Sequence, residues 1–97
     1  MSVSNNSEAP GFDAPDVIVV GGGVIGLATA WRASRAGLKV AVADARPARG
    51  ASWAAAGMLA PVTEVHPGEE SLLTLNLVAA SRWPVWVEEL TSDSGLE

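Results

Sequence analysis

The sequence lacks cysteine and tyrosine altogether, and it has a single histidine among its 97 residues. Without cysteine, the chain can form no disulfide, no thiolate metal site and no thiol nucleophile. With one histidine, it has few side chains that could act as general bases near neutral pH. We therefore expect the chemistry of this chain to depend on a molecule that it binds.

Positive charge is also scarce. Six Lys and Arg residues stand against eleven Asp and Glu residues, which gives a net charge of −5. This balance disfavours nucleic acid or an anionic membrane as the main partner. Hydrophobic residues make up 48% of the chain and charged residues 18%, so the composition predicts a globular chain rather than a disordered one. Its length allows one domain at most.

The longest hydrophobic run is too short for a membrane span. Residues 17–31 are almost wholly apolar, but a spanning helix needs roughly 20 such residues. A signal peptide would carry positive charge before its apolar run. Here the preceding residues include Glu8, Asp13 and Asp16, and the first cation is Arg32. We therefore predict a cytoplasmic protein that has no membrane as partner.

The first half of the chain has the pattern of a strand, a helix and a second strand. Residues 16–20 form a continuous β-branched run, as in strands that are buried on both faces of a parallel sheet. Residues 24–36 predict a helix with Gly37 as its left-handed cap, and residues 39–44 predict a second strand. Together they predict a βαβ unit with a right-handed crossover. The inward face of the helix is expected to include Ile25, Ala28 or Thr29, and Ala33.

The second half predicts a long loop and then a helix. Residues 45–68 hold several prolines and glycines and predict a loop, in which the Ala-rich residues 51–59 could form a helical turn. From Glu69 onward, apolar residues recur at three- and four-residue steps, as on one face of a helix. Pro84 predicts a kink or a restart in this helix. Residues 92–95 have the composition of a turn.

These elements predict an incomplete α/β fold. Residues 1–15 are rich in Ser, Asn, Pro and Gly and predict a mobile leader, so that residues 16–97 form the folded part. Two strands and two or three helices cannot cover both faces of a doubly wound sheet, and they cannot bury four tryptophans. We therefore expect either the N-terminal piece of a longer protein or a chain that needs a partner.

A glycine motif follows the first predicted strand. Gly21, Gly23 and Gly26 have the G-x-G-x-x-G spacing between a strand and a helix, and Asp44 ends the next strand. This context is typical of a Rossmann-like dinucleotide-binding unit, in which the helix N-terminus holds the pyrophosphate and the acid accepts hydrogen bonds from the ribose. A glycine-rich turn without a ligand is the alternative. Asp44 disfavours NADP, but it does not separate NAD from FAD.

Two weaker signals have simpler interpretations. His66 lies among glutamates, but a metal site would need a second histidine or a cysteine at a defined spacing, so a solvated acidic loop is the favoured interpretation and no metal is predicted. Arg46 and Arg49 could reach a phosphate, but solvated loop residues are favoured for them as well.

Three segments together resemble a known family. The segments GGGVIGLATA, VAD and ASWAAAGMLAP resemble the D-amino-acid-oxidase-like flavoproteins, and within them the glycine oxidases, which are FAD enzymes linked to thiamine biosynthesis. The first motif is shared by very many flavoproteins, whereas SWAAAGMLAP is more specific to the glycine-oxidase branch. The resemblance covers residues 16–97, which would then be part of an FAD-binding domain.

The resemblance implies a set of FAD contacts. The motif glycines would lie along the pyrophosphate, the acid would hold the ribose although glutamate is usual there, and an Ala-Gly-Met segment would lie against the flavin ring. Backbone N–H groups aimed at the polar edge of the ring would stabilise negative charge on it. The alternative for that segment is an Ala-rich stretch packed in a core. The expected cofactor-binding residues are Gly21, Gly23, Val24, Ile25, Gly26, Asp44, Ala45, Ala51, Ser52, Ala56, Gly57 and Met58.

The resemblance also implies a reaction. The full enzyme would oxidise glycine or another small amino acid or amine to the imine with O₂ as acceptor, giving hydrogen peroxide and ammonia. We assign no catalytic residue in this chain, because the substrate site would lie mostly outside it. A homo-oligomer of the full-length protein stays open. Two alternatives are a truncated, non-catalytic fragment and an NAD-dependent dehydrogenase module.

Overall fold

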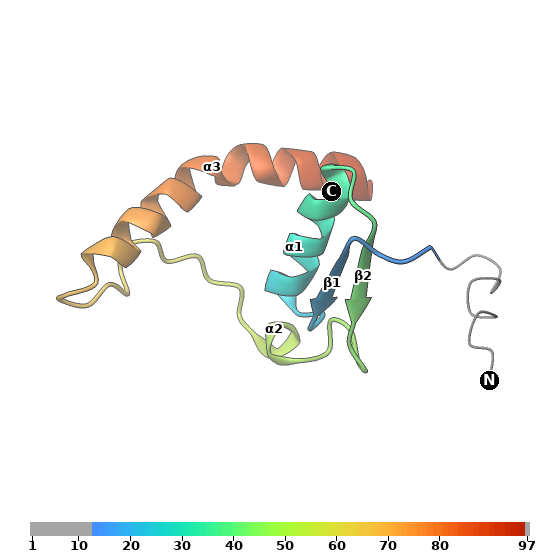
Figure 1. Cartoon of the computed structure of the whole chain (residues 1–97). Coiled ribbons are helices and arrows are strands. Elements are labelled where there is room, and N and C mark those ends of the chain that lie inside the picture. The colour runs from blue at the N-terminus through green and yellow to red at the C-terminus, as the bar shows by residue number, and fades with distance from the viewer. Residues whose placement is uncertain (1–12, 97) are drawn as a thin grey trace, which may run out of the picture. The chain divides into compact units, whose positions relative to one another are not determined.

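The computed structural model describes residues 13–96, and the chain divides into two compact units, Met1–Gly57 and Met58–Glu97. Residues 1–12 of the expected leader lie outside the described residues. In the first unit, strand β1 (Val17–Val20) is followed by helix α1 (Val24–Arg35), strand β2 (Val40–Ala43) and the single-turn helix α2 (Ala51–Ala54). The second unit contains one helix, α3 (Glu70–Ser94) (Figure 1).

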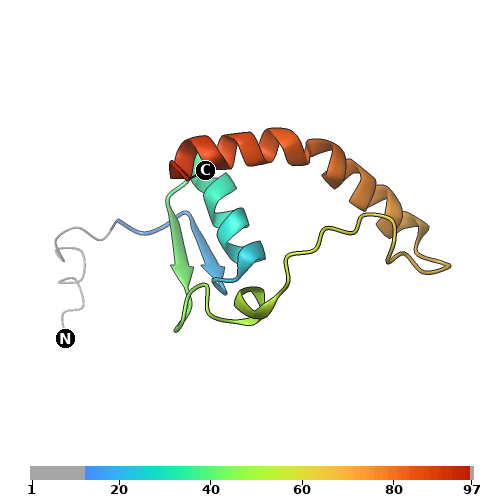
Figure 2. The same ribbon diagram turned by 180° about the vertical axis from the view of Figure 1, so that it is seen from behind.

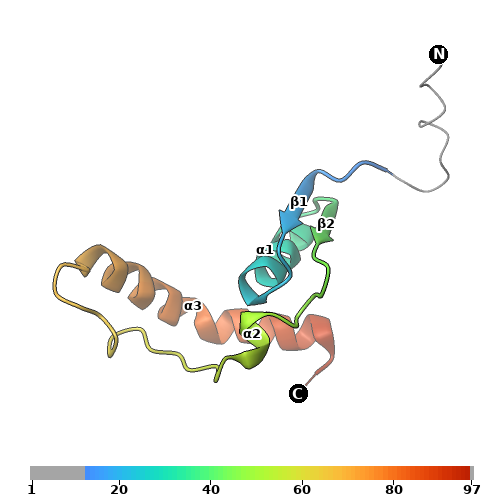
Figure 3. The same cartoon turned by 90° about the horizontal axis from the view of Figure 1, so that it is seen from below.

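The first unit is a βαβ unit, as predicted. β1 and β2 pair in parallel, with Val17 opposite Val40 and Val20 opposite Ala43. α1 packs against both strands and runs in the opposite direction to them (Figure 1). Both strands are slightly shorter than the predicted runs. Seen from below, α2 follows β2 as one isolated turn, which is the helical turn expected in the Ala-rich stretch (Figure 3).

Helix α1 ends at a glycine in the left-handed conformation. Gly37 has a φ of +90°, and its N–H donates to the carbonyl of Ser34 at 3.0 Å. The N–H of Leu38 donates to the carbonyl of Ala33 at 3.2 Å. These two bonds form a Schellman motif, in which the left-handed residue reverses the chain after the helix. The predicted left-handed cap at Gly37 is confirmed.

The expectation that the strands are buried on both faces is wrong. Along β1, Val17 and Val19 are half-buried on the side of α1, whereas Ile18 and Val20 are 62% and 84% exposed. The physical reason is that α1 is the helix that packs against the strands in the first unit, so it covers one face of the strand pair and leaves Ile18 and Val20 on the other. Among residues 13–96, Gly22 and Ala30 are the only buried residues.

The inward face of α1 also differs from the prediction. Ala28 and Ala33 are half-buried as expected, but Ile25 is 81% exposed and the buried position is Ala30. Gly26, Ala30 and Ala33 follow one another at four- and three-residue steps, so the strands contact a stripe of small residues. A stripe without large side chains brings the helix axis close to the strands. The resulting contact is tight but small.

In the second unit, α3 is one continuous helix of 25 residues. Of the predicted kink or restart at Pro84, the restart is therefore wrong, and the helix changes direction gradually along its length (Figure 2). Pro84 has no N–H for the carbonyl one turn earlier, and a bend accommodates the loss without ending the helix. Residues 92–95 do not form a separate turn: the helix continues to Ser94, and Gly95, with a φ of +68°, caps it.

Apolar side chains of α3 are largely exposed, as is Trp53 in the first unit. Trp83 is 43% exposed and stacks on Trp86 with 5.2 Å between the ring centroids, and Trp53 is 66% exposed. In the part of the chain that the structure describes, no helix combines the length and the hydropathy that a membrane crossing requires.

Candidate functional site

The glycine loop between β1 and α1 is shaped by one positive φ angle and one close approach. Gly21 has a φ of +104°, which side chains rarely tolerate, so a glycine makes the turn out of β1. A Cβ at Gly26, in the first turn of α1, would collide with the carbonyl oxygen of Gly21. The absence of this Cβ lets the helix begin directly against the end of the strand. The N-terminus of α1 is thereby fixed at the carboxyl end of the sheet.

The N-terminus of α1 leaves several N–H groups open. Gly23 is the N-cap residue, and no side chain of its own caps the helix. Among residues 13–96, the N–H groups of Gly23, Ile25 and Gly26 have no acceptor. Open donors at the positive end of a helix dipole favour an anion, and phosphate groups bind at such positions.

Ser52 contacts the same end of α1 from a distant part of the sequence. Its hydroxyl oxygen accepts a hydrogen bond from the Val24 N–H at 3.0 Å. A Cβ at Gly23 would lie 3.1 Å from this hydroxyl oxygen, tighter than ordinary contact. Ser52 thus places α2 beside the helix N-terminus, next to the open donors. Its own hydroxyl hydrogen is free to donate to a bound oxygen.

Asp44 lies at the end of β2 and faces the glycine loop. One carboxylate oxygen accepts from the Gly22 N–H at 2.6 Å, and the other accepts from the Arg46 N–H at 2.7 Å. These two backbone donors, Gly22 first, lower the pKa of the carboxyl below its ordinary value of 3.8, against a smaller opposing effect of desolvation. The group is therefore an anion at neutral pH. Each oxygen keeps a lone pair for a further donor such as a ribose hydroxyl.

The loop after Asp44 contains a feature that the sequence does not reveal. Ala48 has a φ of +58°, the only non-glycine residue with positive φ among residues 13–96. Its N–H donates to the Gly22 carbonyl oxygen at 2.8 Å. The left-handed conformation is costly for alanine, so the hydrogen bond and the surrounding loop must hold it. An alanine carries no sequence signal for this conformation.

Arg49 and Trp53 form a contact of their own. The Arg49 guanidinium lies 4.1 Å from the centroid of the Trp53 ring, a cation–π contact at an exposed site. Of the two arginines considered for a phosphate, Arg46 contributes its backbone N–H to Asp44. The tryptophan at this position therefore pairs with a cation of its own loop.

The structure brings part of the expected site together. Gly21, Gly23, Asp44 and Ser52 surround the N-terminus of α1. Val24 is in the first turn of α1, but its N–H is already engaged by Ser52. The other expected residues are exposed, except for the half-buried Gly26. Gly26 and Ile25 lie in the first turn of α1, Ala51 begins α2, Ala45, Ala56 and Gly57 lie on loops, and Met58 begins the second unit.

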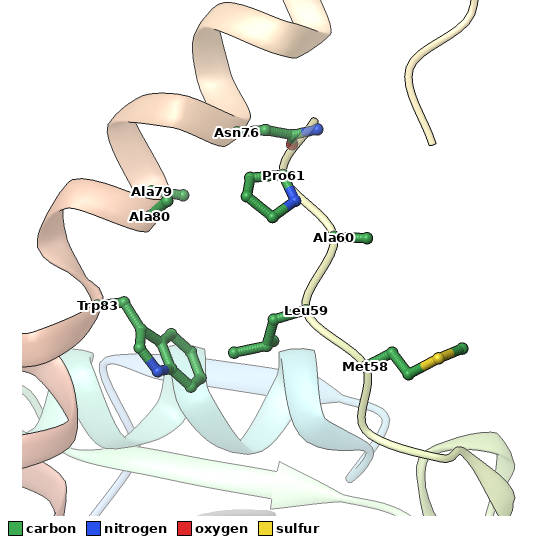
Figure 4. Close-up of a pocket in the computed structure, with 8 residues that line it drawn as sticks. All are labelled: Met58, Leu59, Ala60, Pro61, Asn76, Ala79, Ala80 and Trp83. Atoms are coloured by element: carbon green, nitrogen blue, oxygen red, sulfur yellow. The ribbon is translucent and has the colours of Figure 1, made fainter. Parts of the chain in front are cut away.

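The second unit has an apolar pocket of about 360 Å³. The segment from Met58 to Pro61 forms one side, and Asn76, Ala79, Ala80 and Trp83 of α3 form the other (Figure 4). Leu59 points toward Trp83, whereas Met58 points away from α3 (Figure 4). Asn76 supplies the side-chain amide in an otherwise apolar lining.

The His66 region serves the start of α3. The His66 N–H donates to a Glu69 carboxylate oxygen at 2.9 Å, and the Gly68 N–H donates to a Glu70 carboxylate oxygen at 3.3 Å. The carboxylates therefore bind backbone donors in the turn before the helix. Within residues 13–96, no group of three or more metal-binding side chains is close enough to hold a metal ion.

Comparison with known proteins decides the family. The family model DAO, described as FAD dependent oxidoreductase, matches residues 16–97. The chain belongs to this family. FAD is its cofactor, which settles the choice between NAD and FAD that Asp44 left open.

Two proteins that are similar to this chain carry names from thiamine biosynthesis. The chain is 44% identical over 69 residues to a Rhizobium etli protein provisionally named thiamine biosynthesis oxidoreductase ThiO, a match that covers 69% of this chain and 21% of the relative. It is 40% identical over 81 residues to the bifunctional protein ThiO/ThiG of Trichormus variabilis, covering 84% of this chain and 12% of the relative. The chain thus spans a small part of each relative's length. No solved structure matches the chain significantly.

The described residues fit part of an FAD molecule. The open N–H groups of Gly23, Ile25 and Gly26 suit the pyrophosphate, and the missing Cβ at Gly23 leaves backbone accessible beside them. The Asp44 carboxylate suits the ribose hydroxyls and would repel a 2′-phosphate. These are the groups of the ADP half of the cofactor.

Proposed function

We propose that residues 16–97 are part of the FAD-binding domain of a glycine-oxidase-like flavoenzyme. The complete enzyme oxidises glycine or another small amino acid or amine to the imine, with O₂ as acceptor that is reduced to hydrogen peroxide, and hydrolysis of the imine by water releases ammonia. The observation that carries this proposal is the set of open N–H groups at the start of α1, next to the Asp44 carboxylate. The family match to residues 16–97 supports it.

In this proposal the chain's own residues bind and orient the cofactor. The N–H groups of Gly23, Ile25 and Gly26 donate to the pyrophosphate oxygens at the positive end of α1. Asp44 accepts from the adenosine ribose, Ala45 lies beside the adenine, and Ala51 and Ser52 lie near the phosphate or ribityl region. Val24 and Ile25 lie along the pyrophosphate, and the Val24 N–H is engaged by Ser52.

The segment Ala56, Gly57 and Met58 is proposed to lie against the flavin ring. Small side chains allow a flat ring to approach the backbone, and Gly57 has a φ of +75°, which turns the chain at this point. FAD bound beside this segment would supply a hydride acceptor for oxidation of the substrate at its α-carbon. Backbone N–H groups near the ring's polar edge stabilise the negative charge that develops there. No side chain of this segment needs to move a proton.

The names of the relatives support a role connected with thiamine biosynthesis. The substrate is a small amino acid or amine, and most of its site lies in parts of the enzyme that this chain does not contain. We further propose that the 97-residue chain alone shows no oxidase turnover. The exposed apolar face of β1 supports this, because Ile18 and Val20 lack the cover that a complete sheet would give.

The experiment that tests the proposal is a binding measurement on the purified chain. Titration with FAD, followed by flavin fluorescence and by a visible band that survives gel filtration, should give saturable one-to-one binding. Gly23→Ala, which places a Cβ against Ser52 and beside the open donors, should weaken it. Gly50→Ala is the matched control, because a Cβ there meets open space. Equal FAD binding by Gly23→Ala and the parent chain would contradict the proposed phosphate site.

A further inference from the structure

The peptide groups of the glycine loop are held by one continuous segment, residues 44–52, which we call the collar. The Gly22 N–H donates to Asp44, and the Gly22 carbonyl accepts from the Ala48 N–H. Gly22 is buried, and a Cβ there would lie 3.2–3.3 Å from Asp44 and from the Cα of Pro47. Both hydrogen-bonding groups of this residue are therefore satisfied by the collar.

The collar is formed at a local cost. Ala48 adopts the left-handed conformation, and in doing so it brings its N–H to the Gly22 carbonyl. A residue keeps a strained backbone conformation only where the surrounding structure holds it there. Such residues cluster at functional sites. The far end of the collar reaches α1, where the Ser52 hydroxyl accepts from the Val24 N–H. The glycine loop is thus fixed at both ends by side chains that follow β2.

These contacts sort the N–H groups of the loop into two sets. Gly21 donates to the Ala43 carbonyl, Gly22 to Asp44, and Val24 to Ser52. Gly23, Ile25 and Gly26 remain open among the described residues. The open set lies at the N-cap and in the first turn of α1 and is interrupted at Val24. An anion placed there meets the backbone N–H groups that the collar leaves unused, beside the hydroxyl of Ser52.

We propose that Asp44 and Ser52 are positioning residues that hold the glycine loop in its binding conformation before a cofactor arrives. By engaging the N–H groups of Gly22 and Val24, they restrict phosphate binding to Gly23, Ile25 and Gly26. The restriction to phosphate rests on the function proposed above, whereas the pre-formed loop does not. Asp44 therefore has a role in addition to any hydrogen bond with ribose.

The first test uses the ligand-free chain and amide NMR. The Gly22 and Arg46 amide protons should shift together as pH is lowered, with one midpoint that belongs to the Asp44 carboxyl. Asp44→Asn should abolish both pH-dependent shifts. Ser52→Ala should move the Val24 amide resonance, and Ser52→Thr, which keeps the hydroxyl, should restore it. If the Gly22 amide titrates unchanged in Asp44→Asn, the proposal is overturned.

A matched control separates positioning from general loss of stability. Asp16 also accepts from a backbone N–H, that of Lys39, at 2.8 Å, but at the opposite end of the strand pair. Asp16→Asn should move the Lys39 amide and leave the Gly22 and Val24 amides in place. If Asp16→Asn perturbs the glycine loop as strongly as Asp44→Asn does, the collar has no specific role and the proposal fails.

The second test compares two ligands, ADP and 2′,3′-dideoxy-ADP, by calorimetry. If Asp44 holds the loop, Asp44→Asn weakens both ligands by about tenfold, as expected for one hydrogen bond. Ser52→Ala should do the same, and Ser52→Thr should recover most of the loss. If Asp44→Asn weakens ADP alone, Asp44 acts only through the ribose hydroxyls, and the positioning role is overturned.

The two tests distinguish failure of this inference from failure of the proposed function. If the parent chain binds neither FAD nor either nucleotide, the proposed function and the restriction to phosphate both fall. The amide shifts of the ligand-free chain then still decide whether Asp44 and Ser52 hold the loop. Binding by the parent chain with unaltered amide shifts in the variants would overturn the collar while leaving the cofactor site intact.

Discussion

The two ends of the β1–β2 pair use the same kind of contact for different results. At the amino end, Asp16 accepts from the Lys39 N–H, and the Asp16 N–H donates back to the Lys39 carbonyl at 2.8 Å. At the carboxyl end, Asp44 accepts from the Gly22 N–H. Each aspartate therefore joins the two strands. At the amino end, Asp16 and Lys39 exchange two hydrogen bonds. At the carboxyl end, N–H groups in the first turn of α1 stay without an acceptor among the described residues.

The difference comes from where the helix begins. In a βαβ unit the helix N-terminus follows the first strand, so unpaired N–H groups gather at the carboxyl end of the sheet. At the other end of α1, the carbonyls of Arg32, Ala33 and Ser34 accept from the N–H groups of residues 36–38. A ligand site on this unit is consequently expected at one end only. Three substitutions and a change of pH test this difference between the two ends.

Gly26→Ala should have the largest effect, because it removes the close approach on which the open end depends. The added Cβ meets backbone, the Gly21 carbonyl oxygen, and backbone cannot move aside as a flexible side chain can. We expect the free energy of unfolding of the first unit to fall by about 3 kcal/mol, together with loss of FAD binding. Chemical denaturation monitored by circular dichroism measures the first effect.

Gly50→Ala is the control for this substitution. Gly50 has a φ of −90°, and a Cβ there meets nothing within 4 Å. Its substitution should change the free energy of unfolding by less than about 0.5 kcal/mol. If Gly26→Ala and Gly50→Ala unfold at the same denaturant concentration, the close approach of α1 to the glycine loop does not contribute to stability.

Acid should weaken the carboxyl end through Asp44. The folded-state pKa of this carboxyl is lowered, so its contribution to stability is present above the unfolded-state pKa, near 3.8, and is lost as pH falls through the folded-state pKa. Asp44→Asn should therefore lower stability at neutral pH and flatten the decline of stability in acid. Denaturation curves between neutral pH and pH 3 measure this. Parallel declines in Asp44→Asn and the parent chain would contradict the role of the ionised carboxylate.

Ala48→Gly should stabilise the carboxyl end slightly. Relief of the left-handed conformation raises the free energy of unfolding by about 1–2 kcal/mol. The greater backbone freedom of glycine in the unfolded chain lowers it by about 0.5–1 kcal/mol. We expect a net gain of about 0.5–1 kcal/mol in the free energy of unfolding. Ala54→Gly, in the helical turn of α2, is the control and should be neutral or destabilising. A loss of stability in Ala48→Gly would mean that the conformation is not strained.

Much of the first unit could be predicted from the sequence, because its signals are local. The β-branched run, the glycine spacing and Gly37 each fix a strand, a turn or a cap with little help from distant residues. Burial could not be predicted this way. A continuous apolar run indicates that a strand needs cover on both faces. Whether Ile18 and Val20 are in fact covered depends on which other elements pack on the sheet. For the same reason, the exposure of Ile25 was missed.

In the candidate site, too, local features could be predicted from the sequence and contacts between distant residues could not. The positions of Gly21, Gly26 and Asp44 relative to α1 follow from motif spacing. The engagement of the Val24 N–H by Ser52 joins residues 28 positions apart and depends on the path of the loop between them. The conformation of Ala48 has no sequence signal at all, since glycine or asparagine is the usual residue at positive φ. The FAD contacts inferred from the family resemblance, those of Ala56, Gly57 and Met58 included, stay predictions.

Lys39→Gln should have the smallest effect, and it tests whether the amino end depends on charge. The Lys39 ammonium lies 2.9 Å from an Asp13 carboxylate oxygen, but the two side chains are 60% and 85% exposed, so solvent and salt screen the pair. The substitution keeps the backbone N–H that Asp16 accepts from. We expect a change below about 0.5 kcal/mol in the free energy of unfolding, and less in high salt. A loss of stability larger than that of Asp16→Asn would mean that the ion pair stabilises this end more than the Asp16 hydrogen bond does. Asp16 and Asp44 would then no longer have the same role at the two ends.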